Sequence, residues 1–380
     1  MMRPLKTAVT PMLLMATLTN VQAHILYEEG DKKLELIGKV LLERDFSKDK
    51  GEEGDQSALR LGLKGEMPMA DDLKAGEMIK LFGQLELGKS LTPAPVNTRA
   101  AVIGIEGESI GKLSYGRTLG VMSEVTGFTG ILPVFCNDAL GDGADRFGTG
   151  RATGLLRWYT PKVQGVQLAV QYLPKNSAED SKETEKHKDK QLKGSNGDGY
   201  GIALTHDTGM GLTWGAAYNQ GAKNLKQKQH YYNPNRPEMF AVSVKYDHEL
   251  FYVAAAYAQT RNQLFFNNKA LICQSGVAKP AKPGVFANQS QGFEVVAQYK
   301  FANGLQPTVG YLQSTVTLKD DIYDTKEKNV HFVDVGCNYE LSKQFSVAAD
   351  YKVNLLKEDK AKILGVSAEN ILGIGLTYVF

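Results

Sequence analysis

The sequence predicts an all-β protein, an antiparallel transmembrane β-barrel of about sixteen strands. Three observations lead to this fold. Runs of about ten residues alternate apolar with polar or small side chains, which is the period of a strand whose two faces meet different surroundings. Short links between these runs alternate with long ones. The chain also opens with the features of an export signal.

The expected signal peptide covers residues 1–23. It has two early positive charges, an apolar stretch from Ala8 to Leu18, and small residues that end at Ala23. A membrane helix is a poorer interpretation, because the apolar stretch is well short of the roughly 20 residues that would cross hydrocarbon. We therefore expect cleavage after Ala23 and a single barrel domain over residues 24–380.

The strands are expected wherever the alternation is clear. In the run 58–67, for example, Leu59, Leu61 and Leu63 alternate with charged residues and glycine. Such a run would show apolar side chains on one face and polar side chains on the other. The expected strands are 36–46, 58–67, 79–88, 99–107, 111–117, 151–159, 166–172, 199–207, 210–219, 239–247, 251–259, 291–301, 305–314, 331–341, 344–353 and 370–380.

The order of links separates a membrane barrel from a soluble β-sandwich. Short links such as 108–110, 248–250 and 302–304 alternate with long ones. A sandwich also alternates apolar and polar residues but rarely keeps this order of links. An outer-membrane barrel requires it, with short periplasmic turns, long external loops and a closed sheet whose edges are all paired.

Charge and cysteine content exclude several classes of partner. The formal net charge is +2, and removal of Arg3 and Lys6 with the signal leaves 0, so we expect no nucleic-acid partner. The cysteines Cys136, Cys273 and Cys337 are odd in number and widely spaced, which argues against a disulfide framework. They also lack metal-site spacing, so no metal or cofactor is expected.

A glycine-rich segment between two strands, residues 118–150, is the candidate constriction loop. Connections of this length within a compact fold are usually functional or disordered. This one is too apolar for a solvated tail. We therefore expect it to pack against an interior wall and narrow the lumen. Its apolar residues are Leu119, Val121, Met122, Val125, Phe128, Ile131, Leu132, Val134 and Phe135.

A set of long motifs covers nearly the whole length of the chain. They are YEEGDKKLELIGKV, LRLGLKGE, LSYGRTLGV, GFTGILPVF, FGTGR, SNGDGYG, VAQYKFANGLQP and ENILGIGLTYVF. In these motifs the chain resembles the trimeric general porins of the Gram-negative outer membrane, the OmpC, OmpF and PhoE type. The resemblance implies a sixteen-stranded barrel whose third external loop folds into the lumen. It also implies a homotrimer in outer-membrane lipid and lipopolysaccharide, which passes ions and small hydrophilic solutes by passive diffusion.

The resemblance also implies a pore constriction in which basic wall residues face acidic loop residues. By motif, Lys39, Arg60, Arg117 and Arg151 match the basic positions. Glu86 matches a carboxylate of the third strand, and Asp138 matches an acidic loop residue. Lys39 and Arg60 also lie on the lumen side of their strands by alternation.

The loop departs from the family pattern at two acidic positions. The family usually reads G-Y-T-D-x-L-P-E-F-G-G-D, whereas this chain has Gly130 and Val134 where the first two carboxylates stand. We therefore expect a reduced cation preference or a weak anion preference. The alternative is that Asp142 and Asp145 restore the balance.

Other functions remain open at this stage. No enzyme is expected, because the six histidines are scattered and neither GxSxG nor HExxH occurs. The barrel could instead act mainly as an adhesin or phage receptor, or as a solute-specific channel. The long external loops could bind phage or toxin, and the lysines of the charged segment 175–199 could bind lipopolysaccharide phosphates.

Overall fold

The computed structural model describes residues 24–69, 79–91, 95–136, 138–142, 147–176, 196–224, 227–228, 235–267, 284–319 and 324–380. The signal peptide expected at 1–23 lies outside these ranges, as do Cys273, Asp145 and most of the charged segment 175–199. No helix in the described ranges is long and apolar enough to cross a membrane.

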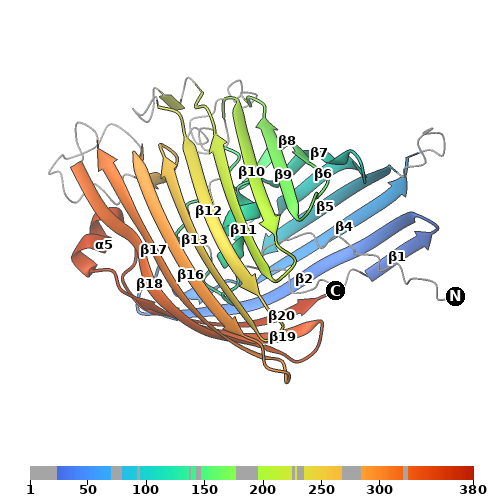
Figure 1. Ribbon diagram of the computed structural model, residues 1–380. Coiled ribbons are helices and arrows are strands. Elements are labelled where there is room, and N and C mark those ends of the chain that lie inside the picture. The colour runs from blue at the N-terminus through green and yellow to red at the C-terminus, as the bar shows by residue number, and fades with distance from the viewer. Residues whose placement is uncertain are drawn as a thin grey trace.

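The chain forms a closed antiparallel β-barrel (Figure 1). The main sheet has 18 strands, of which β1 and β3 are short additions and the other 16 make the wall. Pairing of β2 with β20, from Lys39–Val379 to Ser47–Ile371, closes it. The wall strands are β2 (Lys32–Ser47), β4 (Ala58–Pro68), β5 (Lys80–Ser90), β6 (Asn97–Gly107), β7 (Gly111–Leu119), β8 (Arg151–Tyr159), β9 (Val166–Leu173), β10 (Gly199–Asp207), β11 (Leu212–Gln220), β12 (Glu238–Asp247), β13 (Phe251–Arg261), β16 (Gln289–Tyr299), β17 (Leu305–Lys319), β18 (Asp324–Glu340), β19 (Phe345–Asn354) and β20 (Ile371–Val379).

The predicted fold class is confirmed, and each expected run coincides with one wall strand. The largest differences are at β2, β17 and β18, which are longer than expected. Of these, β17 and β18 extend at the end with long loops. Their extra length joins the barrel to the long loop between β19 and β20, which contains α5 (Glu358–Leu364). Leu364 of α5 packs on Val316 and Leu318, so inner positions of β17 are apolar here because a loop covers them.

Short strands complete the sheet at two places. β1 (His24–Glu29) pairs with the first residues of β2, and beyond it Phe380 exchanges backbone hydrogen bonds of 2.7 and 3.0 Å with Gly38. The two ends of the barrel domain therefore lie along one edge of β2 (Figure 1). β3 (Gly54–Asp55) also pairs with β2, and β14 (Phe265–Asn267) with β15 (Gly284–Phe286) forms a separate hairpin.

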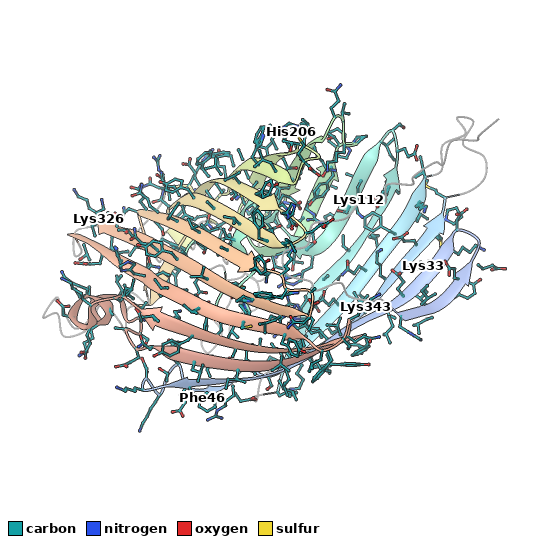
Figure 2. The ribbon with its side chains drawn as sticks, turned by 60° about the horizontal axis from the view of Figure 1, so that its bottom comes forward. Lys33, Phe46, Lys112, His206, Lys326 and Lys343 are labelled. Carbon is teal, nitrogen blue, oxygen red and sulfur yellow. The ribbon has the colours of Figure 1, made fainter. Side chains whose placement is uncertain are left out.

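The two ends of the barrel differ. Lys33 and Lys112 lie toward the end with short turns, whereas Phe46 and Lys326 lie toward the end with long loops (Figure 2). Along the wall, the two faces of a strand also differ. In β12 the inner residues from Met239 to Lys245 are buried, while Phe240, Val242 and Val244 on the outer face are exposed. An exposed apolar belt of this kind matches a wall surrounded by lipid.

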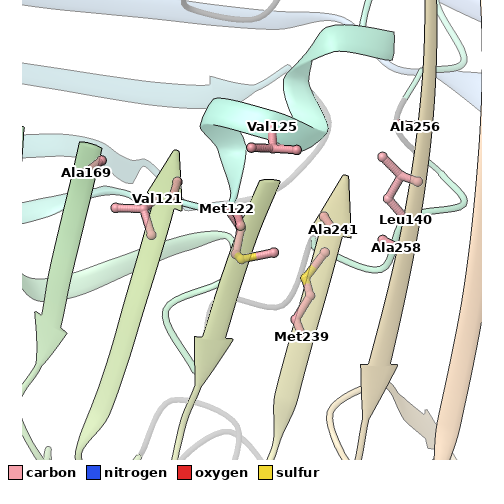
Figure 3. Packing of buried hydrophobic residues seen from close by; sticks show 11 residues of the cluster. Val121, Met122, Val125, Leu140, Ala169, Met239, Ala241, Ala256 and Ala258 are labelled. Atoms are coloured by element: carbon pink, nitrogen blue, oxygen red, sulfur yellow. The ribbon is translucent and has the colours of Figure 1, made fainter. Parts of the chain in front are cut away.

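The described residues between 120 and 150 fold into the barrel and pack on its inner wall, as expected. The loop begins with α1 (Ser123–Thr126) and the 3-10 turn η1 (Gly127–Thr129). Val121, Met122 and Val125 contact a wall made almost wholly of alanine (Figure 3). The wall residues of this cluster are Ala169, Ala203, Ala217, Met239, Ala241, Ala256 and Ala258 on β9 to β13.

Candidate functional site

The loop covers one side of the lumen and leaves the other side open. After α1 it continues around the wall, where Phe128 and Leu132 pack against β13, β16, β17 and β18. At its tip, Val134 reaches β20 beside Gly373. The wall from β2 to β6, which carries the predicted pore residues Lys39, Arg60 and Glu86, faces the space that remains.

Polar wall side chains hold the loop by its backbone. Gln171 accepts from Val121 N at 2.7 Å and donates to Gly148 O at 2.7 Å, so it ties together the two limbs of the loop. Asn219 donates to Phe147 O at 2.8 Å, and Tyr252 donates to Phe128 O at 2.6 Å. These contacts satisfy backbone groups of an irregular segment that lies away from bulk water.

Two wall carboxylates continue this set of contacts. Glu294 accepts from Ala139 N at 2.9 Å and from the Thr129 hydroxyl, and its side chain is fully buried. Asp350 accepts from Val134 N at 2.9 Å and from Phe135 N at 3.3 Å. Sequence reasoning missed all of these residues. In the sequence, such residues can be recognised as polar residues among small ones on the inner face of a strand.

Glycines mark where the loop comes closest to the wall. A Cβ added at Gly310 would lie 2.8 Å from Leu132 Cδ1, and one added at Gly292 would overlap the backbone carbonyl of Ala139. Real Cβ atoms do not make such contacts, because protein interiors are close-packed. The loop therefore packs against the wall where the inner residues of β9 to β20 are small.

Opposite the loop, three basic side chains form a row across neighbouring strands. Lys39 on β2 is the cross-strand partner of Arg60 on β4, and Arg60 is the partner of Gly88 on β5. Arg99 from β6 lies over Gly88, where an added Cβ would be 2.7 Å from Arg99 Cδ. Arg99 Nε then donates to Glu86 Oε1 at 2.8 Å. The structure thus brings Lys39, Arg60 and Glu86 together and adds Arg99.

The position of Arg99 follows from a β-bulge. The pairing of β5 with β6 shifts by one residue between Glu86–Ala100 and Leu87–Thr98, which leaves Arg99 as the extra residue. A bulge turns a side chain away from the face that strict alternation would give it. Alternation alone places Arg99 outside the barrel, so sequence reasoning missed it.

The structure places Arg117 apart from this row. Gly116 pairs with Leu155, whose side chain is buried inside the barrel. The side chain of the next residue, Arg117, therefore leaves the backbone on the outer face of the strand. Its guanidinium donates to Thr98 O at 2.6 Å and to Thr153 Oγ1 at 3.1 Å. Arg151 is closer to the row, because its Nη1 donates to the backbone oxygen of Arg99 at 2.7 Å.

Loop residues contribute little free negative charge to the opening. Asp138 forms an ion pair with Lys352 of β19 at 3.2 Å. Cys136 lies within electrostatic range of Lys39 and Arg60. Burial, followed by the neighbouring Asp138 carboxylate, raises the pKa of its thiol to about 12, so the thiol is neutral at pH 7. Asp142 turns back into the loop, where its Oδ2 accepts from Thr126 Oγ1 at 2.5 Å.

The two positions that lack the usual acids have different surroundings. Gly130 has no side chain and ends the η1 turn. Val134 points at the wall rather than across the opening, since a Cβ added at Gly373 would lie 2.8 Å from Val134 Cγ1. The opening is therefore lined by a row of basic side chains on one side and by a largely apolar loop tip near it.

Comparisons with known proteins agree with this architecture. The model of the Gram-negative porin family matches residues 29–380. Outer membrane porin F of Xenorhabdus nematophila is 36% identical over 396 residues, with 100% of both chains covered. Outer membrane porin C of Salmonella typhimurium is 36% identical over 387 residues, with 97% of each covered.

A solved structure gives the same result. OmpF of Salmonella typhi, determined in complex with daunomycin, superimposes with a TM-score of 0.79 and 28% sequence identity. The match covers 94% of this chain and 100% of that chain. Together with the closed barrel and the loop inside it, these matches establish both the family and the passive, non-enzymatic nature of the protein. The chain belongs to the Gram-negative porin family and is a general diffusion channel of the outer membrane.

Proposed function

We propose that this general diffusion pore favours anions more than relatives with acidic constriction loops do, and that Lys39 and Arg60 set its preference. The observation that carries the proposal is the pairing of charges. Among the described residues, Glu86 is held by Arg99 and Asp138 by Lys352, whereas Lys39 and Arg60 form no ion pair within 4.0 Å. Two positive charges thus remain for solutes to meet.

The expected preference is modest. At 6 to 8 Å in water-like surroundings a unit charge is worth about 0.5 to 0.7 kcal/mol. Salt at about 0.1 M screens charges beyond roughly 10 Å. Rings of charge tune which ion enters a pore without making it exclusive. The bias should therefore be several-fold rather than absolute, and small neutral solutes should still pass.

The first prediction concerns reversal potentials in a planar bilayer under a KCl gradient. The unmodified protein is expected to show a chloride-leaning potential, and the double variant Lys39→Gln with Arg60→Gln should move it toward potassium, by about two- to threefold in permeability ratio for each charge. Lys326→Gln, outside the basic row, is the control and should change little. Clear cation selectivity of the unmodified protein would reject the proposal.

Leakage of solutes from liposomes distinguishes a diffusion pore from the competing interpretation, in which the barrel is chiefly an adhesin or receptor. A general diffusion pore releases small sugars from liposomes at rates that fall smoothly with solute size. A solute-specific channel would saturate with one sugar, and a barrel that serves only as a receptor would leave the liposomes tight.

Assembly and partners follow from the resemblance to trimeric general porins. A homotrimer is expected, which light scattering in detergent would record as three times the protomer mass. Lipopolysaccharide and phage or toxin are expected to meet the long-loop end. Lipopolysaccharide that copurifies with the barrel, and loss of it on neutralising the lysines of 175–199, would support that site.

A further inference from the structure

Glu43 on β2 lies near the row of basic side chains, and it forms no ion pair within the described part of the chain. Glu35, Lys39 and Glu43 occupy the same inner face of β2, four residues apart. At the rise of a strand, each lies roughly 13 Å from the next. Lys39 is thus flanked by one carboxylate toward the short turns and one toward the long loops.

Glu35 and Glu43 have different surroundings. Glu35 is buried and pairs with Lys33 and, at 3.6 Å, with Lys64. Glu43 is partly exposed, and no ion pair within 4.0 Å joins it to another residue of the described ranges. Its cross-strand partner on β20 is Gly375, and Glu43 Oε2 is 3.7 Å from the place where a Cβ on that glycine would be. The glycine leaves its carboxylate uncovered on the lumen wall.

The loop tip lies next to this part of β2. Asp45, two residues after Glu43, pairs with Gly373. A Cβ on Gly373 would touch both Val134 Cγ1, at 2.8 Å, and Asp45 Oδ1, at 3.1 Å. Asp45 is buried under the tip, so Glu43 is the carboxylate of this pair that remains open to solvent.

The charges around Glu43 connect it to the basic row. It interacts electrostatically with Lys39, as well as with Asp45 and Asp350. Lys39 in turn interacts with Arg60 and Arg99. An ion that passes the loop tip along β2 therefore meets the unpaired Lys39 ammonium and the unpaired Glu43 carboxylate in succession.

We propose that Glu43 is a selectivity-determining residue of this pore, which attracts cations on the long-loop side of Lys39 and limits the anion preference produced by Lys39 and Arg60. The wall strand β2, rather than the loop, then supplies the unpaired negative charge of the pore. This inference rests on the proposed channel function. It assigns ion choice to a residue that no motif of the sequence singled out.

The test compares two substitutions that remove the same charge from the same face of one strand. In alkaline buffer, where the Glu43 carboxylate is ionised, Glu43→Gln should raise the chloride-to-potassium permeability ratio about two- to threefold at low salt, and the shift should shrink as ionic strength rises. Glu35→Gln should change the ratio much less, because its charge is already neutralised by Lys33 and Lys64. Unheated electrophoresis of both variants checks that each barrel is folded.

The outcomes separate this inference from the proposed function. Equal reversal potentials for Glu43→Gln and the unmodified protein would overturn the role of Glu43 while leaving the channel intact. An equal shift in Glu35→Gln would also overturn it, since any lumen carboxylate would then suffice. A folded protein that carries no current would reject the channel function itself.

Discussion

Replacing Gly292 with alanine is expected to lower the single-channel conductance and to destabilise the barrel. Gly292 lies on the inner face of β16, where an added Cβ would overlap the carbonyl of Ala139 and lie 3.1 Å from Leu140 Cα. Both contacts are with loop backbone, which cannot rotate away as a side chain could. The loop must therefore move off the wall and into the open part of the lumen. Overpacking of this kind costs about 1–3 kcal/mol.

Gly83→Ala is the matched control. Gly83 lies on the outer face of β5, where a Cβ would meet its nearest neighbours at 3.7 to 3.8 Å, an ordinary contact distance. Conductance in symmetric KCl and the temperature at which the barrel loses its compact electrophoretic form are the measurements. If Gly292→Ala conducts and melts like Gly83→Ala, the loop does not pack on β16.

Replacing Glu294 with alanine is expected to release the middle of the constriction loop. The substitution removes the acceptor for Ala139 N, at 2.9 Å, and for the Thr129 hydroxyl. A buried donor left without a partner costs about 1–3 kcal/mol. Loss of these contacts loosens the middle of the loop, so its motion should appear as open-channel noise and brief partial closures. The barrel should also unfold at a lower temperature.

Glu294→Gln provides the control for that experiment. Glutamine keeps the length of the side chain and one acceptor oxygen, so it can still bind Ala139 N. We expect its channel noise to stay near that of the unmodified protein and its melting to fall only slightly. Equal noise in the alanine and glutamine variants would show that the hydrogen bonds of Glu294 do not hold the loop.

Strand positions could be predicted because each depends on local alternation. Leu59, Leu61 and Leu63 point one way and Arg60 the other for a reason contained in the strand itself. The same argument placed Lys39 and Arg60 on the lumen side, where the pairing of β2 with β4 makes them cross-strand partners. Glu86 was predicted from its match to a family motif.

Alternation failed where the backbone was irregular or the partner was distant. The bulge at Arg99 reverses its side chain, and nothing within β6 announces a register shift against β5. Arg117 matched a motif but begins from the other face of β7. The alanines and glycines of β9 to β20 were visible in the sequence, yet their meaning depends on a loop that is up to about two hundred residues away along the chain.

By itself, the sequence determined that the strands form a membrane barrel, because the period of two is a property of each strand and the alternation of short with long links separates a barrel from a sandwich. It also determined that residues 118–150 are too apolar to stay in solvent. Only the tertiary structure decided which charges pair. Glu86 and Asp138 find cations on other strands, whereas Lys39, Arg60 and Glu43 do not. Whether two charged side chains form an ion pair depends on the distance between them. That distance depends on strand register, on β-bulges and on the path of the loop.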